Sequence, residues 1–194
     1  LMLSTTSWAQ TVLEAGKIYH FQNAHFTGRA ITANEGTNTA VQAAATNSKD
    51  LKQQWYVSKD GESYIFRNMY NGYYLSQTGQ NAWGLTETCT ANSNKFEYIK
   101  AGGTNNTIRS TSVSDNDNGY MHLGSEGQTN IQGWGSGSGG TQWTVTKVPF
   151  TDEHDAILGQ FAENSSTDAV GAALRAIFSD EACTMLNSKY TTAH

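Results

Sequence analysis

The sequence predicts an all-β fold made of three repeats of about four short strands, followed by a short α-helical segment at the C-terminus. Three observations lead to this expectation. The composition combines only 15 % charged residues with 19 Gly and one Pro, as expected for many strands joined by turns. One stretch of the chain places strands and tight turns in direct succession. The signals of that stretch recur three times.

The stretch 53–75 (QQWYVSKDGESYIFRNMYNGYYL) alternates short β-prone runs with turn signals. The run 55–57 (WYV) leads into Asp60-Gly61, a dipeptide typical of a tight hairpin turn. Residues 64–66 (YIF) resume the β pattern, and a turn cluster at 68–72 precedes a third short strand. We therefore expect strand, turn, strand, turn and strand over this stretch.

The same organisation recurs in three units, which span residues 17–60, 62–102 and 106–148. Their turn glycines, which lie 44 and then 47 residues apart, are Gly28, Gly72 and Gly119. A period of this size indicates repeats that bury a shared core. Three blades cannot close a β-propeller, whereas three four-stranded units suit a barrel closed by pseudo-threefold repetition, which leaves no long free edge.

Each unit closes on a large ring that we expect to fill this core. The closing rings, 41 and then 47 residues apart, are Trp55, Phe96 and Trp143. A polar residue stands two positions earlier in each unit, and these residues are Gln53, Asn94 and Thr141. We interpret the three rings as structural rather than as ligand-binding residues, because a barrel interior needs large apolar side chains.

The motif Gln53-x-Trp55, followed by Asp60-Gly61 and Gly72-x-x-Leu75, resembles the join between two repeats of a ricin-B-type lectin, a QxW-repeat protein. The resemblance covers residues 16–148. It implies a β-trefoil over residues 10–150 and glycans as partners, as in exported bacterial carbohydrate-active proteins. Repeats two and three depart from the family pattern, because Asn and Thr replace its glutamine and Phe replaces one tryptophan.

Both ends of the chain differ from the repeats. Residues 1–9 look like the remnant of a secretory signal peptide, with a small-x-small cleavage pattern at 7–9 and Gln10 as the first mature residue; the alternative is a frayed arm. If the signal interpretation holds, the protein is secreted, periplasmic or on the cell surface. No apolar run reaches transmembrane length, so we expect no membrane insertion.

Residues 151–194 are expected to be helical. The segment 152–163 places Ile157, Leu158 and Phe161 at helical spacing, and two further short helices are expected at 170–178 and 181–187. Three short helices make a poor domain by themselves. We interpret the segment as the start of a further domain, and the alternative is a cap docked on the barrel.

The charge distribution argues against two classes of partner. Residues 1–151 hold ten acidic and ten basic residues, and the net charge of −5 comes from the seven acidic and two basic residues of 152–194. Nucleic acids and anionic membrane surfaces both need clustered Lys and Arg, which the repeats lack.

No catalytic or metal-binding motif is found. The five histidines and two cysteines have no metal-ligand spacing, and neither Ser125 nor Ser136 forms a nucleophile elbow. The glycine-rich stretch 133–140 lacks the ending of a phosphate loop and is interpreted as a hairpin tip. We therefore expect no cofactor, no metal and no enzyme activity in this chain, and its oligomeric state stays open.

Two tryptophans in polar, glycine-containing loops are the candidate sugar platforms. Trp83 lies 13 residues before Phe96, and Trp134 lies 9 residues before Trp143. A flat ring can stack on the apolar face of a sugar while nearby polar groups bind its hydroxyls. The alternative is that each ring packs beneath its own loop. Repeat one has only small residues at 43–45.

The polar partners of the two platforms are expected to be neutral. The resemblance implies a sugar-binding Asp after each Gly-x-x-Leu strand, but Thr32, Ser76 and His122 stand at those positions. A carboxylate would be the strongest polar anchor of such a site. The candidates for its replacement are Tyr73, Ser76 and Asn94 beside Trp83, and His122 and Gln142 beside Trp134.

Three functions fit these observations. The first is a non-catalytic carbohydrate-binding module of an exported protein. The second is a structural or protein-interaction β-trefoil without sugar affinity. The third is a targeting module of a glycan-degrading hydrolase whose catalytic domain is missing from this chain.

Overall fold

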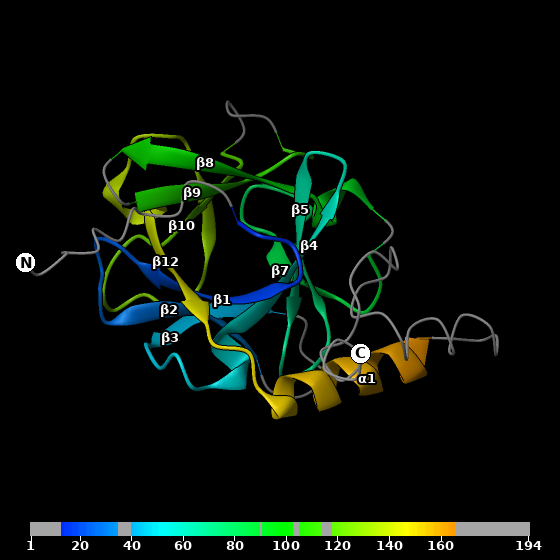
Figure 1. The fold of residues 1–194 in the computed structure, drawn as a ribbon. Coiled ribbons are helices and arrows are strands. Elements are labelled where there is room, and N and C mark those ends of the chain that lie inside the picture. The colour runs from blue at the N-terminus through cyan, green and yellow to red at the C-terminus, as the bar shows by residue number, and fades with distance from the viewer. Residues whose placement is uncertain (1–12, 35–39, 90, 103–104, 114–117, 166–194) are drawn as a thin grey trace, which may run out of the picture.

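The structure, a computed structural model, describes residues 13–34, 40–89, 91–102, 105–113 and 118–165. Within these residues, twelve β-strands are joined by loops and short 3-10 helices, and one α-helix follows the last strand (Figure 1). The expected signal-peptide remnant at 1–9 and the expected helices at 170–178 and 181–187 lie outside the described residues.

Each repeat contributes four strands, as the sequence predicts. The strands are β1 (Lys17–Asn23), β2 (Arg29–Ala33), β3 (Val41–Ala45) and β4 (Gln54–Asp60) in repeat one, β5 (Ser63–Asn68), β6 (Tyr74–Gln77), β7 (Trp83–Thr86) and β8 (Phe96–Gly102) in repeat two, and β9 (Asn105–Ser110), β10 (Tyr120–His122), β11 (Gln132–Trp134) and β12 (Trp143–Val148) in repeat three. The first and fourth strands of the repeats form the barrel, and the second and third strands of each repeat form a hairpin.

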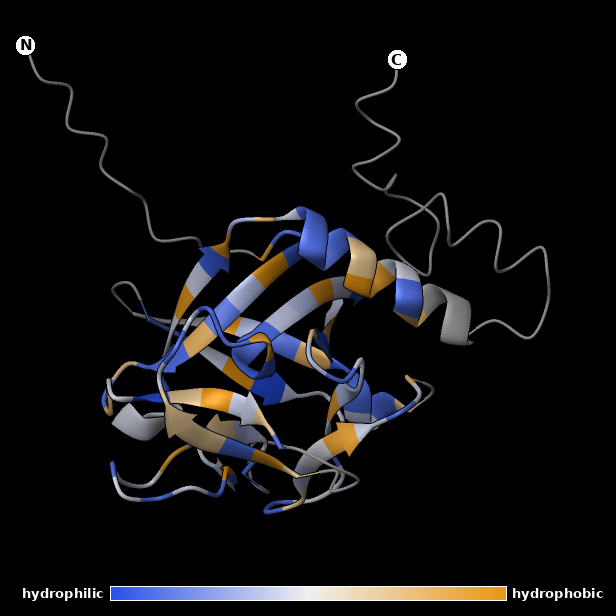
Figure 2. Ribbon diagram, turned by 90° about the horizontal axis from the view of Figure 1, so that it is seen from below, coloured by the Kyte–Doolittle hydropathy of each residue, from blue (hydrophilic) through white to orange (hydrophobic). Residues whose placement is uncertain are grey.

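The barrel closes on itself through antiparallel pairing of six strands. Each of them pairs with two others, in the order β1, β4, β5, β8, β9, β12 and back to β1. The hairpins β2–β3, β6–β7 and β10–β11 attach to the barrel through β1, β5 and β9 respectively. Hydrophilic and hydrophobic residues alternate along several strands in Figure 2, as expected when one face of each strand meets the core.

The three closing rings lie in this core. Trp55, Phe96 and Trp143 are each at most 1 % exposed. The Trp55 indole N–H donates to the carbonyl of Ile31 at 3.3 Å, and that of Trp143 donates to the carbonyl of Met121 at 3.2 Å. Both acceptors lie on the second strand of the same repeat.

Repeat two meets the same requirement with different residues. Phe96 has no N–H to donate, and the amide of Asn94 donates to the Leu75 carbonyl at 2.9 Å instead. The change from Gln-x-Trp to Asn94-x-Phe96 therefore keeps a buried carbonyl satisfied, because a shorter amide takes over the role of the missing indole.

The helix α1 (Asp152–Ser165) packs against the barrel. Leu158, 6 % exposed, joins Ile18, Tyr56 and Met69 in a second apolar cluster. His154 is 4 % exposed, and its Nε2 lies 2.8 Å from Oε1 of Gln54 on β4.

A glycine in a turn of repeat two makes room for the far end of α1. A Cβ on Gly72 would lie 2.9 Å from the Phe161 ring, and the backbone there has a φ of +75°, which favours glycine. The Arg67 guanidinium lies over the same ring at 4.5 Å and over the Tyr74 ring at 5.0 Å. The turn glycine thus serves both the hairpin and the docking of α1.

Candidate functional site

The two candidate tryptophans have opposite environments. Trp134 is 48 % exposed, whereas Trp83 is 6 % exposed and belongs to the core cluster. Both stand on the third strand of their repeat. The difference lies in which face of the hairpin each ring occupies, and the strand register decides it.

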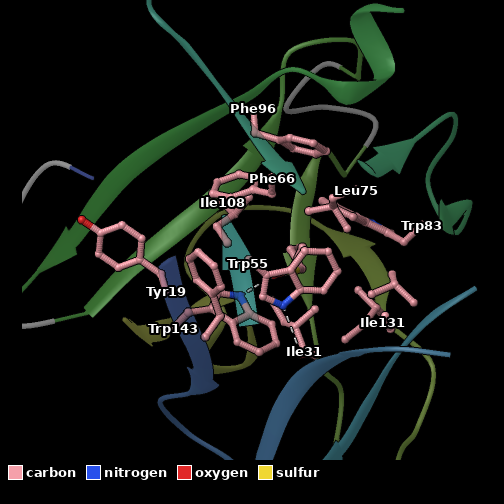
Figure 3. Close-up of a cluster of buried hydrophobic side chains, with 14 of the residues drawn as sticks. Tyr19, Ile31, Trp55, Phe66, Leu75, Trp83, Phe96, Ile108, Ile131 and Trp143 are labelled. Carbon is pink, nitrogen blue, oxygen red and sulfur yellow. Dashed lines mark hydrogen bonds between the residues drawn. The ribbon is translucent and has the colours of Figure 1, made fainter. Parts of the chain in front are cut away.

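The prediction that Trp83 is an exposed platform is wrong. In the β6–β7 hairpin, Trp83 pairs with Gln77. This pair lies two residues along each strand from the Leu75–Leu85 pair. Because side chains alternate along a strand, Trp83 and Leu85 lie on the same, inner face of the hairpin. Figure 3 shows the Trp83 ring in the core near Leu75. It stacks on Phe96, with ring centroids 5.8 Å apart and planes 19° apart. Trp83 is therefore a core residue on β7, rather than a ring packed beneath its own loop as in the alternative interpretation.

The indole N–H of Trp83 also has a buried partner. The Gln77 amide, oriented so that both of its ends are satisfied, accepts from Trp83 Nε1 at 3.1 Å and donates to the Gly119 carbonyl at 3.1 Å. Gln77 is fully buried. Trp83 is therefore held on its face and at its polar edge, and it connects repeat two to repeat three.

Trp134 lies three residues after the position equivalent to Trp83. In repeat three, Gly133 pairs with Met121, which lies in the core. Trp134 pairs with Tyr120, and this pair lies on the face of the hairpin opposite to the core face. The residue that takes the place of Trp83 is Ile131, which is 3 % exposed. Because side chains alternate along a strand, two positions separated by an odd number of residues place their side chains on opposite faces.

A histidine supports the exposed ring from beneath. The rings of His122 and Trp134 stack with centroids 5.1 Å apart and planes 21° apart, as diagonal neighbours on one face of β10–β11. His122 is 7 % exposed, so one face of the indole is covered and much of the other is open to solvent. Burial lowers the pKa of His122 below its ordinary value of 6.5. A neutral imidazole therefore supports a rigid, partly open indole.

Ser138 completes the contacts around His122. Its hydroxyl lies 3.2 Å from His122 Nε2, and it also accepts from the N–H of Gly140 at 3.3 Å, as the N-cap of the 3-10 helix η4 (Gly139–Thr141). A Cβ on Gly140 would collide with the Leu123 carbonyl and lie 2.8 Å from His122 Nε2. His122 Nδ1 is buried and has no hydrogen-bond partner among the described residues.

Sequence reasoning missed Ser138, although a signal exists. Ser138 stands three residues before Thr141, and Asp50 stands three residues before Gln53 and caps the equivalent 3-10 helix η1 (Leu51–Gln53). Comparing the two caps across the repeats identifies a side chain whose position is fixed by the fold. The side-chain amide of Asn118 is a second neutral group close to Trp134. Its Oδ1 lies 3.7 Å from the position that a Cβ on the next residue, Gly135, would occupy.

The polar residues proposed beside Trp83 serve the fold in other ways. Tyr73 donates its hydroxyl proton to Glu87 at 3.1 Å, and that hydrogen bond raises the pKa of Tyr73. Ser76 is 3 % exposed, and its hydroxyl has no partner among the described residues. Asn94 is 1 % exposed and binds the Leu75 carbonyl and the Thr86 hydroxyl. With Trp83 buried, these groups surround no exposed ring.

Of the two partners expected for Trp134, the structure brings one to it. His122 lies directly beneath the ring. Gln142 instead accepts from the side-chain amide of Asn105, at the start of β9, at 3.1 Å, and so belongs to the contact between barrel strands. The candidate site therefore consists of Trp134, His122 and Ser138, with Asn118 at its edge.

The described part of the chain offers no metal centre, since it contains no group of three or more His, Cys, Asp and Glu side chains placed to hold an ion. None of its helices is both long and apolar enough to cross a membrane. The arrangement at Trp134 can stack on a flat apolar surface and exchange hydrogen bonds with uncharged groups.

A six-stranded barrel with three hairpins related by pseudo-threefold symmetry defines a β-trefoil. Solved β-trefoil structures superpose on this chain and support the same assignment. The sequence matches no protein-family model and no curated protein, so comparison rests on solved structures. One is a β-trefoil named BEL, at 13 % identity and a TM-score of 0.58, covering 72 % of this chain and 99 % of that one.

Two further structures of similar fold act on or bind sugars. The Polyporus squamosus lectin, solved with the epitope Neu5Acα2-6Galβ1-4GlcNAc, is 17 % identical with a TM-score of 0.57, over 70 % of this chain and 50 % of that one. A GlcNAcα1-4Gal-releasing endo-β-galactosidase from Clostridium perfringens is 19 % identical with a TM-score of 0.56, over 69 % and 33 %. The match thus spans half or less of each of these proteins. At such identities the likeness establishes the fold.

Proposed function

We propose that this β-trefoil is a non-catalytic carbohydrate-binding module with one site, on the β10–β11 hairpin of repeat three. The observation that carries the proposal is Trp134, a half-exposed indole stacked on a buried, neutral histidine. Sugars present an apolar C–H face and a polar rim, and a rigid ring flanked by a few fixed polar groups matches both. Lectin and glycosidase structures of the same fold support a sugar ligand.

The rigidity of the platform favours binding, because a ring that is already held in place loses little freedom when a ligand stacks on it. Trp134 is held by His122, and His122 is held by Ser138. The polar groups around the ring, the Ser138 hydroxyl and the Asn118 amide, are uncharged. We therefore expect weak binding of a single sugar, near millimolar or about −4 kcal/mol, that changes little with salt.

The burial of Trp83 removes the second platform that the sequence suggested. Two sites on one barrel would have produced avidity for clustered glycans. With one site in repeat three, a monomeric chain is expected to gain no such avidity. Polymer binding would then depend on contacts along one glycan chain.

The wider role proposed is that of a glycan-targeting module within an exported, bacterial protein. The signal-like residues 1–9 motivate this part of the proposal. Localisation of the full-length protein in its host, with and without residues 1–9, tests it.

The experiment that tests the site compares the wild type with Trp134→Ala on a glycan array, with pull-down on mucin and plant polysaccharides. Tyr70→Ala is the matched control, because Tyr70 is an aromatic residue of similar exposure, 46 %, in the turn between β5 and β6. We expect Trp134→Ala to lose binding and Tyr70→Ala to retain it. Equal binding by wild type and folded Trp134→Ala refutes the site. Absence of binding by the wild type across the panel favours the alternative, a structural or protein-interaction module.

A further inference from the structure

We infer that the Trp134 site continues across the boundary between repeats three and one to His25, so that its ligand is a glycan chain of two or more sugar units. This inference rests on the proposed function and adds a subsite to it. His25 stands in the loop between β1 and β2, more than a hundred residues before Trp134, and is exposed.

A continuous series of contacts leads from Trp134 to His25. The indole stacks on His122, and His122 Nε2 lies 3.2 Å from the Ser138 hydroxyl. The next residue is Gly139, and a Cβ placed on it would lie 3.1 Å from Nδ1 of His25. The two imidazoles therefore flank the Gly139–Gly140 backbone, with His122 against Gly140 and His25 against Gly139.

The backbone between the two histidines carries no side chains. Gly140 cannot carry one, since a Cβ there would collide with the Leu123 carbonyl. Gly139 is partly exposed. A sugar chain stacked on Trp134 can therefore pass Ser138 toward the backbone at Gly139, beside which the His25 ring stands. At the end of this path it meets an imidazole.

His25 is held in place by the same residue that holds Gly140. The side-chain oxygen of Asn23 accepts from the backbone N–H of His25 at 3.0 Å, and its amide donates to the Gly140 carbonyl at 2.9 Å. The backbone N–H of Ala24 donates to the Gln142 carbonyl at 2.8 Å. Asn23 is fully buried. The loop of repeat one is thus tied directly to η4 of repeat three, which fixes His25 relative to the site.

The chemistry of His25 suits a sugar hydroxyl. An imidazole presents two ring nitrogens, and a hydroxyl can accept from a protonated one or donate to an unprotonated one. The His25 ring also contacts Phe26 edge-on, with centroids 4.6 Å apart, which restricts its orientation. The subsite is therefore specific for a polar group placed one or more sugar units away from the ring stacked on Trp134. A single sugar on Trp134 does not need it.

The test measures affinity against ligand length for the full chain. The probes are galactose, Galβ1-4GlcNAc and its tetrasaccharide repeat, with size-graded cello-, xylo- and chito-oligosaccharides. Wild type, His25→Ala and Trp134→Ala are compared by calorimetry. The control is Thr27→Ala, which removes an exposed side chain from the same loop.

For at least one series we expect wild-type affinity to rise about tenfold or more with length, equivalent to about 1.4 kcal/mol. His25→Ala is expected to lose this gain and keep the affinity for the shortest ligand, and Thr27→Ala to behave as wild type. A gain with length that His25→Ala retains, or no gain at all, overturns the subsite. Binding that depends on Trp134 but not on His25 leaves the proposed function standing. Absence of all binding removes both.

Discussion

Replacing each of the two tryptophans of the third strands by alanine is expected to give opposite results. Trp83 is 6 % exposed, and burying a tryptophan removes roughly 200 Å² from water. At about 25 cal/mol per Å² that corresponds to about 5 kcal/mol, and core Trp→Ala changes cost about 3–5 kcal/mol. Trp134→Ala loses one ring stack, worth about 0.5–1.5 kcal/mol.

The assay is thermal unfolding followed by near-ultraviolet circular dichroism, combined with glycan pull-down on the same samples. For a chain of this length, about 2–4 °C per kcal/mol predicts a fall in Tm of roughly 6–20 °C for Trp83→Ala and of roughly 1–6 °C for Trp134→Ala. Binding should be lost in Trp134→Ala. Equal falls in Tm for the two variants, or an unchanged Tm in Trp83→Ala with loss of glycan binding, would refute the register argument.

The remaining predictions concern α1 and the site hairpin. Leu158→Ala should lower stability by about 2–3 kcal/mol, because it opens the cluster beneath α1, and an unchanged Tm would mean that α1 contributes nothing to the fold. Burial lowers the pKa of His154 below 6.5, so docking of α1 is strongest above pH 6.5 and weakens as the pH falls below it. Hydrogen exchange of residues 152–161, measured at pH 7.5 and at pH 5, checks this expectation. The variant His154→Gln is expected to remove the pH dependence. Gly133→Ala places a Cβ against the carbonyl oxygens of Asn118 and Gln80 and should cost about 1–3 kcal/mol by urea denaturation, whereas a neutral effect would show that the hairpin can shift.

The fold could be predicted from the sequence because its signals are local and repeated. The β4–β5 turn consists of Gly61 and Glu62, one residue later than the Asp60-Gly61 signal, and Gly61 has a φ of +59°. The period of the closing aromatics corresponds to their equivalent positions in the barrel. The departures at Asn94-x-Phe96 did not obscure the pattern, since Phe96 still fills the core.

The site could be predicted only in part, because strand register depends on loop length. The connection between β7 and β8 has the nine residues 87–95, whereas that between β11 and β12 has the eight residues 135–142. Trp83 lies 13 residues before Phe96, whereas its equivalent Ile131 lies 12 residues before Trp143. Trp134 lies only 9 residues before Trp143, so counting back from the closing rings does not identify equivalent positions. Only the paired strands show which ring faces the core. The apolar stripe of α1 was visible in the sequence, but the surface it covers was not.

The pairing of the first barrel strand with the last has a consequence for how such a module is combined with other proteins. Ile18 on β1 lies opposite Val148 on β12, and paired strands are about 4.8 Å apart. A host chain can thus run into and out of the module at two neighbouring points, so the module can be inserted into a surface loop without forcing the loop apart. For the same reason, joining these points and cutting at the Gly61 turn should give a circular permutant that keeps every strand pair of the barrel. The pairing of strands around the barrel therefore does not depend on which strand comes first in the sequence.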